Sequence, residues 1–83
     1  MTLIFKINKM NTKELGRELR EMYLNAPKGD AVAMIHLFGI MYADEISNFE
    51  NAKKEIIQFS GISKSYITEL SKGVKLAKYV SPK

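Results

Sequence analysis

His36 has the side chain best suited to acid–base or metal chemistry, since it is the only histidine and the chain contains no cysteine. Either role needs neighbouring ligands or a partner acid, but Asp44-Glu45 is the only adjacent acidic pair, and it is expected to solvate a helix end. A glycine-rich phosphate loop is also missing. The sequence therefore predicts no enzyme, metal site, cofactor or small-molecule substrate. His36 is expected to make a structural hydrogen bond or to lie at the edge of an interface.

A second kind of chemistry, the binding of a polyanion, is indicated by the lysines of the C-terminal part. Residues 1–52 carry six basic and seven acidic side chains, whereas residues 53–83 carry seven lysines and two glutamates. Neutralising phosphates releases counterions from a nucleic acid whatever its sequence, which favours binding by such a segment. The alternative is a lysine-rich surface that is only solvated.

Polar side chains that can contact a nucleic acid are concentrated after residue 62. Lysine can contact a guanine edge or a phosphate, serine and threonine can contact either, and glutamate can accept a hydrogen bond from a cytosine amino group or exclude other bases. Lys72, Lys75 and Lys78 recur at three-residue spacing and are expected to lie along a phosphate backbone. The candidate nucleic-acid-binding residues are Ser63, Lys64, Ser65, Tyr66, Thr68, Glu69, Lys72, Lys75 and Lys78.

The length of the chain, 83 residues, predicts a single domain over residues 1–83, without a second lobe to frame a cleft. A domain of this size buries only about 60–65% of the surface that its unfolded chain exposes, so self-association is an expected source of further burial. The lack of cysteine favours a reducing compartment, and no signal peptide or membrane span is predicted. We expect a cytoplasmic, all-α, four- to five-helix domain. Residues 1–10 are expected to form a flexible arm or a short strand, unless the product begins at Met10.

The first helix is predicted to start after Asn11. Glu14 follows this residue at the spacing with which two side chains satisfy the free amide groups of a helix start reciprocally. Pro27 and Gly29 end the helix. Its inward face is formed by apolar residues three and four positions apart. These residues are Leu15, Leu19, Met22, Tyr23 and Ala26.

A second helix is predicted over residues 31–46, with Asp30 as its N-terminal cap. This helix is apolar nearly all round, so it has more apolar surface than one small core can cover. The stripe expected to face the core consists of Ile35, Phe38, Tyr42 and Ile46. The opposite stripe consists of Met34, Leu37 and Met41, and it indicates a homodimer through the helix 31–46. Gly39 permits close approach of a backbone, either at that interface or within the monomer.

A third helix is predicted from residue 49 or 51 to Phe59, and a tight turn follows it. Gly61 can adopt the left-handed conformation with which a helix ends and the chain turns. The residues expected to face inward from this helix are Ala52, Ile56, Ile57 and Phe59.

A fourth helix is predicted over residues 63–72, capped by Ser63 and stopped by Gly73. Ile67 and Leu70 anchor this helix to the core, which turns its polar side chains outward. Residues 74–83 form a basic tail segment, which begins either as a short helix or as an extended stretch.

The two short helices and their turn, residues 52–73, resemble the helix-turn-helix of lambda repressor/Cro-like (Xre-type) regulators. The resemblance is carried, in order, by Gly61, Ile62, Ser63, Ile67 and Leu70. It implies a sequence-specific transcriptional regulator of bacterial or phage origin, which binds double-stranded DNA with the helix 63–72 in the major groove. Ile57 departs from the family, which has a small residue where the two helices cross. This departure predicts a wider crossing or a different register.

The alternative function is that of a protein-interaction module, or of an accessory subunit of a nucleic-acid-processing or defence complex. The same helical geometry serves in assemblies that never meet DNA. This alternative is motivated by the apolar second helix, whose outer stripe would contact a protein partner.

Overall fold

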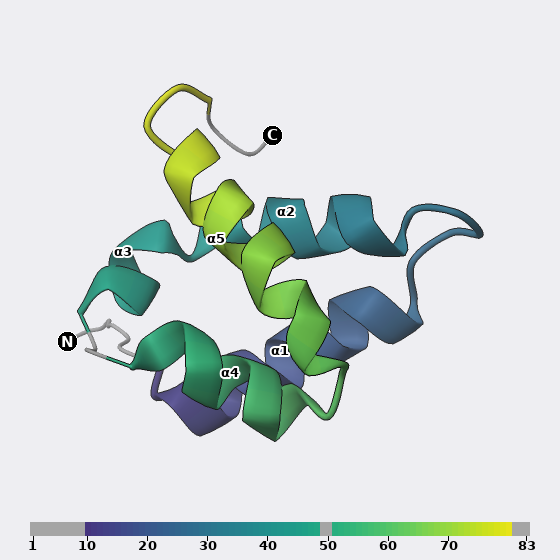
Figure 1. Cartoon of the computed structure of the whole chain (residues 1–83), viewed down its shortest axis with the longest axis horizontal. Helices are drawn as coiled ribbons and strands as arrows, with labels where there is room; N and C mark the ends of the chain where they lie inside the picture. Colours follow the sequence, from purple (N-terminus) through teal and green to yellow (C-terminus); the bar gives the residue numbers. More distant parts are fainter. Residues whose placement is uncertain (1–9, 49–50, 81–83) are drawn as a thin grey trace, which may run out of the picture.

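A computed structural model describes residues 10–48 and 51–80, which form helices joined by turns (Figure 1). The elements are α1 (Thr12–Leu24), α2 (Ala31–Met41), α3 (Ala43–Ser47), α4 (Ala52–Ser60), the 3₁₀ turn η2 (Lys64–Tyr66) and α5 (Ile67–Leu76). The prediction of a small all-α domain with four to five helices is confirmed. The expectation of an arm or strand at the N-terminus falls on residues 1–9, which lie outside the described residues.

The helices pack chiefly as two pairs. α4 lies against α1, and α5 crosses α2 (Figure 1). α3 is a short connection that contacts α4 and α5. The core between the pairs consists of Leu15, Leu19, Ile35, Phe38, Ile46, Ala52, Ile56, Ile57 and Leu70.

α1 begins as the sequence predicts. The Asn11 side chain accepts a hydrogen bond from the backbone N–H of Glu14 at 2.8 Å, and the Glu14 carboxylate accepts one from the N–H of Asn11 at 3.0 Å. Leu15 and Leu19 are fully buried, and Met22 and Tyr23 pack against the same core. This reciprocal cap fixes the start of the helix that supports α4.

The prediction of one continuous helix over residues 31–46 is wrong. The chain leaves helical geometry at Tyr42, whose φ is −113° and ψ is 22°, so that α2 ends at Met41 and α3 starts at Ala43. The bend lets the chain follow the core, where Ile46 is buried and the Tyr42 ring lies 4.9 Å from that of Phe38. The inward stripe is confirmed at Ile35, Phe38 and Ile46.

Gly73 does not stop the last helix, contrary to the prediction. It lies inside α5, which starts only at Ile67 and continues to Leu76. A Cβ at Gly73 would collide with the carbonyl oxygen of His36, and one at Gly39 would lie 2.8 Å from the backbone nitrogen of Val74. These glycines therefore serve a backbone-to-backbone crossing of α2 and α5.

The inward face of α4 differs from the prediction at its end. Ala52, Ile56 and Ile57 are buried as expected, but Phe59 is 51% exposed. The buried face continues instead to Ser60, which follows Ile56 and Ile57 at helical spacing. Phe59 lies beside α1, where its Cβ approaches Gly16.

None of the described helices combines the length and the apolar character needed to cross a membrane.

Candidate nucleic-acid interface

The turn between α4 and η2 has the geometry that a helix-turn-helix needs. Gly61 has a φ of 77°, in the left-handed region, and its N–H donates to the carbonyls of Ile57 and Gln58. A residue with a Cβ adopts this conformation only with strain. Gly61 therefore ends α4 and reverses the chain, as its position in the sequence predicts.

Ser60, which is buried, stabilises the same turn by hydrogen bonds. It is not among the functional residues predicted from the sequence. Its hydroxyl donates to the carbonyl of Ile57 at 2.6 Å and accepts from the N–H of Ile62 at 3.2 Å. The Arg20 guanidinium donates to the Ser60 carbonyl at 3.1 Å and so ties the turn to α1. The only sign of this role in the sequence is that a serine directly precedes the turn glycine. The contact with Arg20 could not be expected from the sequence, because the two residues are 40 positions apart.

Ser63 forms a cap, although the element that it caps is η2 and not an α-helix. Its hydroxyl accepts from the N–H of Ser65 at 3.3 Å and lies 2.9 Å from the Ser65 hydroxyl. Ser63, Lys64 and Ser65 are all exposed. The start of the fourth predicted helix is thus a 3₁₀ turn that presents three polar side chains to solvent.

α5 continues this polar surface. Leu70 and Gly73 are buried on its inner side. Thr68, Lys72 and Lys75 are exposed on the opposite side and are called here the α5 outer face. Helical spacing of three and four residues places them on one side of the helix. Lys78, just beyond α5, is exposed as well.

Two of the predicted contact residues are turned toward the domain instead of away from it. The Tyr66 ring packs on Tyr23 with centroids 5.5 Å apart, and the two hydroxyls lie 3.5 Å apart. That hydrogen bond raises the pKa of Tyr23. Glu69 Oε1 lies 2.7 Å from His36 Nε2, so the imidazole donates to the carboxylate across the α2–α5 crossing. His36 thus makes a structural hydrogen bond.

The electrostatics of this surface favour an anionic ligand. The hydrogen bond from His36, together with the nearby Lys72, lowers the pKa of Glu69 despite partial desolvation. Lys72 Nζ lies 3.5 Å from the other Glu69 oxygen, which partly neutralises both charges. Within the described residues, Lys64, Lys75 and Lys78 have no carboxylate within ion-pairing distance. Their positive charge is available to a ligand.

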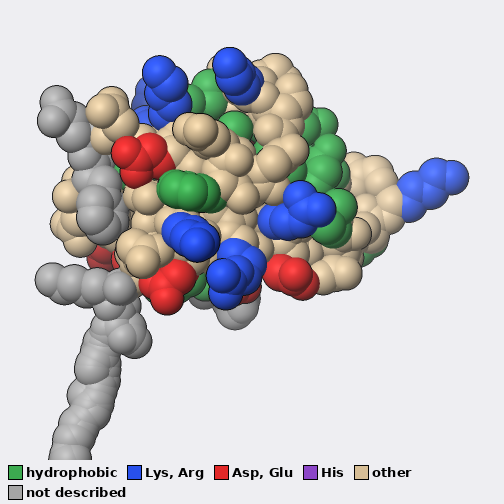
Figure 2. Space-filling model, turned by 90° about the horizontal axis from the view of Figure 1, so that it is seen from below, with side chains coloured by type: hydrophobic (Ala, Val, Ile, Leu, Met, Phe, Trp, Pro, Cys, Tyr) green, Lys and Arg blue, Asp and Glu red, His purple; other side chains and the backbone are tan. Residues whose placement is uncertain are grey.

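The side of the molecule on which α1 and α4 lie also carries basic side chains, with acidic ones among them. Seen from below Figure 1, on the side where α1 and α4 lie, basic and acidic side chains are intermixed with apolar ones (Figure 2). In α1, basic and acidic residues follow one another closely along the helix. Residues 10–48 and 51–80 contain no group of three or more histidine or acidic side chains that could hold a metal ion.

The sequence of the chain is similar to a known family of helix-turn-helix-like domains. A family model described as an HTH-like domain matches residues 11–83. No curated protein and no solved structure matches the chain.

Proposed function

The chain belongs to the HTH-like domain family, and on this basis we propose that it is a sequence-specific DNA-binding protein. The observation that carries the proposal is the α5 outer face, whose threonine and two lysines are exposed on the helix that follows the Gly61 turn. A helix in this position enters the major groove in helix-turn-helix proteins. By its resemblance to lambda repressor/Cro-like regulators, we further propose a small transcriptional regulator of bacterial or phage origin.

The exposed residues divide by the kind of contact that they suit. Ser65 and Thr68 have short hydroxyl side chains that suit base edges, and Lys64 suits a guanine edge or a phosphate. Lys72, Lys75 and Lys78 follow along α5 and beyond it, where ammonium groups suit the phosphate backbone.

Glu69 and Tyr66 are assigned a positioning role in this proposal. Each is held by a contact to another helix, Glu69 to α2 and Tyr66 to α1. They fix the orientation of the contacting helix relative to the domain.

A homodimer through α2 completes the proposal. Two copies related by a two-fold axis place two α5 helices in successive major-groove half-sites. Support comes from Met41, which is 42% exposed, and from Met34 and Leu37, which the domain covers only in part.

The test is fluorescence anisotropy with random duplex DNA at several salt concentrations. If each subunit neutralises three or four phosphates, the slope of log K against log salt is expected to be about −5 to −7 for the dimer. A Lys72→Ala, Lys75→Ala double variant should bind more weakly, with a slope less steep by about 0.9 for each phosphate that is no longer neutralised. Lys28→Ala, in the exposed turn before α2, is the matched control and should bind as the wild type.

Failure to bind DNA at low salt by a folded protein would refute the proposal. The alternative function, a protein-interaction module, would then gain support from the exposed apolar side chains after Gly73: Leu76, Tyr79 and Val80. Binding that does not depend on salt would also contradict the proposal, because phosphate contacts release counterions.

A further inference from the structure

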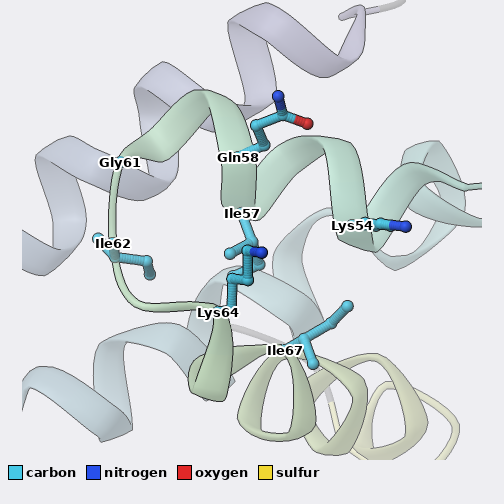
Figure 3. Close-up of a pocket in the computed structure, with 7 residues that line it drawn as sticks. All are labelled: Lys54, Ile57, Gln58, Gly61, Ile62, Lys64 and Ile67. Carbon is cyan, nitrogen blue, oxygen red and sulfur yellow. The ribbon is translucent and has the colours of Figure 1, made fainter.

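A groove opens at the elbow of the helix-turn-helix, between α4 and the start of α5. It has a volume of about 560 Å³ and lies within the size range of small-molecule sites. Its lining residues are Lys54, Ile57, Gln58, Gly61, Ile62, Lys64 and Ile67 (Figure 3). Ile57, whose bulk predicts a wider crossing of the two helices of the helix-turn-helix, is one of these lining residues. The groove therefore lies where that crossing is expected.

The floor of the groove is apolar. Ile57 from α4, Ile62 from the turn and Ile67 from α5 converge on it (Figure 3). Ile62 and Ile67 remain partly exposed, so their methyl groups face the open space. An apolar group that fills this space would remove these methyl groups from water, which is favourable in proportion to the area covered.

The only charged groups in the lining are cationic. Lys54 comes from α4 and Lys64 from η2, and no acidic residue contributes to the lining. Within the described part of the chain, neither ammonium has a carboxylate within ion-pairing distance. The side chain of Lys64 extends from η2 toward Ile57, whereas the exposed side chain of Lys54 points away from Ile57 and Lys64 (Figure 3). The groove therefore combines an apolar floor with positive charge at its edge.

We propose that this groove binds a small amphipathic anion, a carboxylate with an apolar tail. The tail lies over the three isoleucines and the carboxylate pairs with Lys64, and with Lys54 once that exposed side chain turns toward the groove. Because Lys64 is also proposed to contact DNA, the bound anion neutralises a DNA contact and weakens DNA binding. DNA in turn weakens anion binding by the same factor. This regulatory consequence rests on the proposed function, whereas the anion site itself does not.

The site is tested without DNA by methyl NMR on protein labelled at its isoleucines, titrated with decanoate below the concentration at which micelles form. Saturable shifts are expected at Ile57, Ile62 and Ile67. Ile40 on α2 reports adsorption elsewhere. Decyltrimethylammonium, which has the same tail and the opposite charge, should shift the groove methyls much less.

Variants separate charge pairing from apolar adsorption. Lys54→Gln with Lys64→Gln should weaken decanoate binding by up to about tenfold, because two exposed ion pairs are removed. Lys75→Gln with Lys78→Gln removes the same charge outside the groove and should leave the affinity within about twofold. Equal shifts with both ligands, or shifts at Ile40 without shifts in the groove, would overturn the site.

The regulatory step is tested by repeating the DNA titration with decanoate present. DNA affinity should fall as the groove fills, and the fall should disappear in the Lys54→Gln, Lys64→Gln variant. Unchanged DNA affinity at a saturated groove would overturn the regulatory step. A protein that binds decanoate in the groove but never binds DNA would refute the proposed function and leave the anion site standing.

Discussion

At the scale of single residues, Glu69 shows how a polar side chain on a proposed contact helix can belong to the domain instead of the ligand. Its carboxylate accepts a hydrogen bond from His36 on α2, and Lys72 lies 3.5 Å from its second oxygen. The sequence marks Glu69 as a candidate base contact. Its observed partners make it a link that sets where Lys72 lies.

This link predicts a pH-dependent contribution to stability. The His36 hydrogen bond lowers the pKa of Glu69 in the folded protein below its ordinary value of 4.5. A lowered carboxyl pKa stabilises the fold above the unfolded pKa, and this stabilisation is lost as the pH falls through the folded value. Glu69→Gln should therefore unfold at lower urea concentration than the wild type at pH 7. The difference should shrink as the pH drops below about 4.5.

Urea unfolding followed by circular dichroism between pH 3 and pH 7 measures this difference. Glu21→Gln, on the exposed side of α1, is the matched control for removal of one carboxylate. A Glu69→Gln deficit that stays constant over the whole pH range would contradict the assigned link.

At the scale of elements, the α2–α5 crossing depends on two glycines that face each other's helix backbone. The missing side chains let the helices approach until Gly39 contacts Gly73 and Val74, and Gly73 contacts His36. Because of this contact, α5 packs mainly against α2 and not against α4, and α2 sets the position of the α5 outer face.

Gly73→Ala is expected to destabilise the fold, although alanine normally stabilises a helix interior by about 1 kcal/mol relative to glycine. The new Cβ would collide with the carbonyl oxygen of His36, and a backbone cannot move aside as a flexible side chain can. Overpacking of this kind costs about 1–3 kcal/mol or more, which outweighs the gain in helix propensity. Thermal unfolding against Thr68→Ala, an exposed substitution on the same helix, measures the effect. A Gly73→Ala variant at least as stable as the wild type would show that the crossing can relax.

Elements fixed by local chemistry are the ones that the sequence predicts well. The reciprocal cap of Asn11 and Glu14 defines the start of α1, and the left-handed Gly61 defines the end of α4. The buried stripe of α2 follows from helical spacing alone. Each of these signals lies within a few residues, so no tertiary information is needed to interpret it.

The features that the sequence misses depend on distant partners. A glycine after a helical segment is the usual sign of a helix end, but Gly73 is used for a close crossing with a helix more than 30 residues away. The same holds in the candidate site, where Ser63 and Ser65 follow local rules while Glu69 is held by His36, 33 residues earlier. Spacing alone cannot reveal either partner.

At the scale of the whole molecule, this small domain leaves large apolar side chains exposed. Met41 lies at the end of α2, and Leu76, Tyr79 and Val80 follow on α5 and beyond it. Tyr79 is 78% exposed. For a domain whose own burial is modest, covering such groups in a second copy adds stability that the monomer lacks.

The homodimer proposal predicts that Met41→Glu weakens self-association. A charge buried in an apolar interface should raise the dimer dissociation constant about tenfold or more. Sedimentation velocity over a range of concentrations measures this constant, and the melting temperature of the wild type should rise with protein concentration. Leu24→Glu, at the exposed end of α1, is the matched control. If both variants and the wild type sediment identically, Met41 does not lie in a dimer interface, and the homodimer through α2 is refuted.

The pairing of the helices has a consequence for the order in which the chain acquires its fold. α1 packs chiefly on α4 and α2 chiefly on α5, so the two pairings interlock along the chain and neither is complete within one half. During synthesis, α1 and α2 leave the ribosome before their main partners exist, and the core closes only after Leu76 has emerged. Folding should thus be slower than that of helical domains whose sequence neighbours pair, because contacts such as Arg20 to Ser60 span 40 residues. A fragment of residues 10–48 should stay largely unfolded until residues 51–80 are supplied.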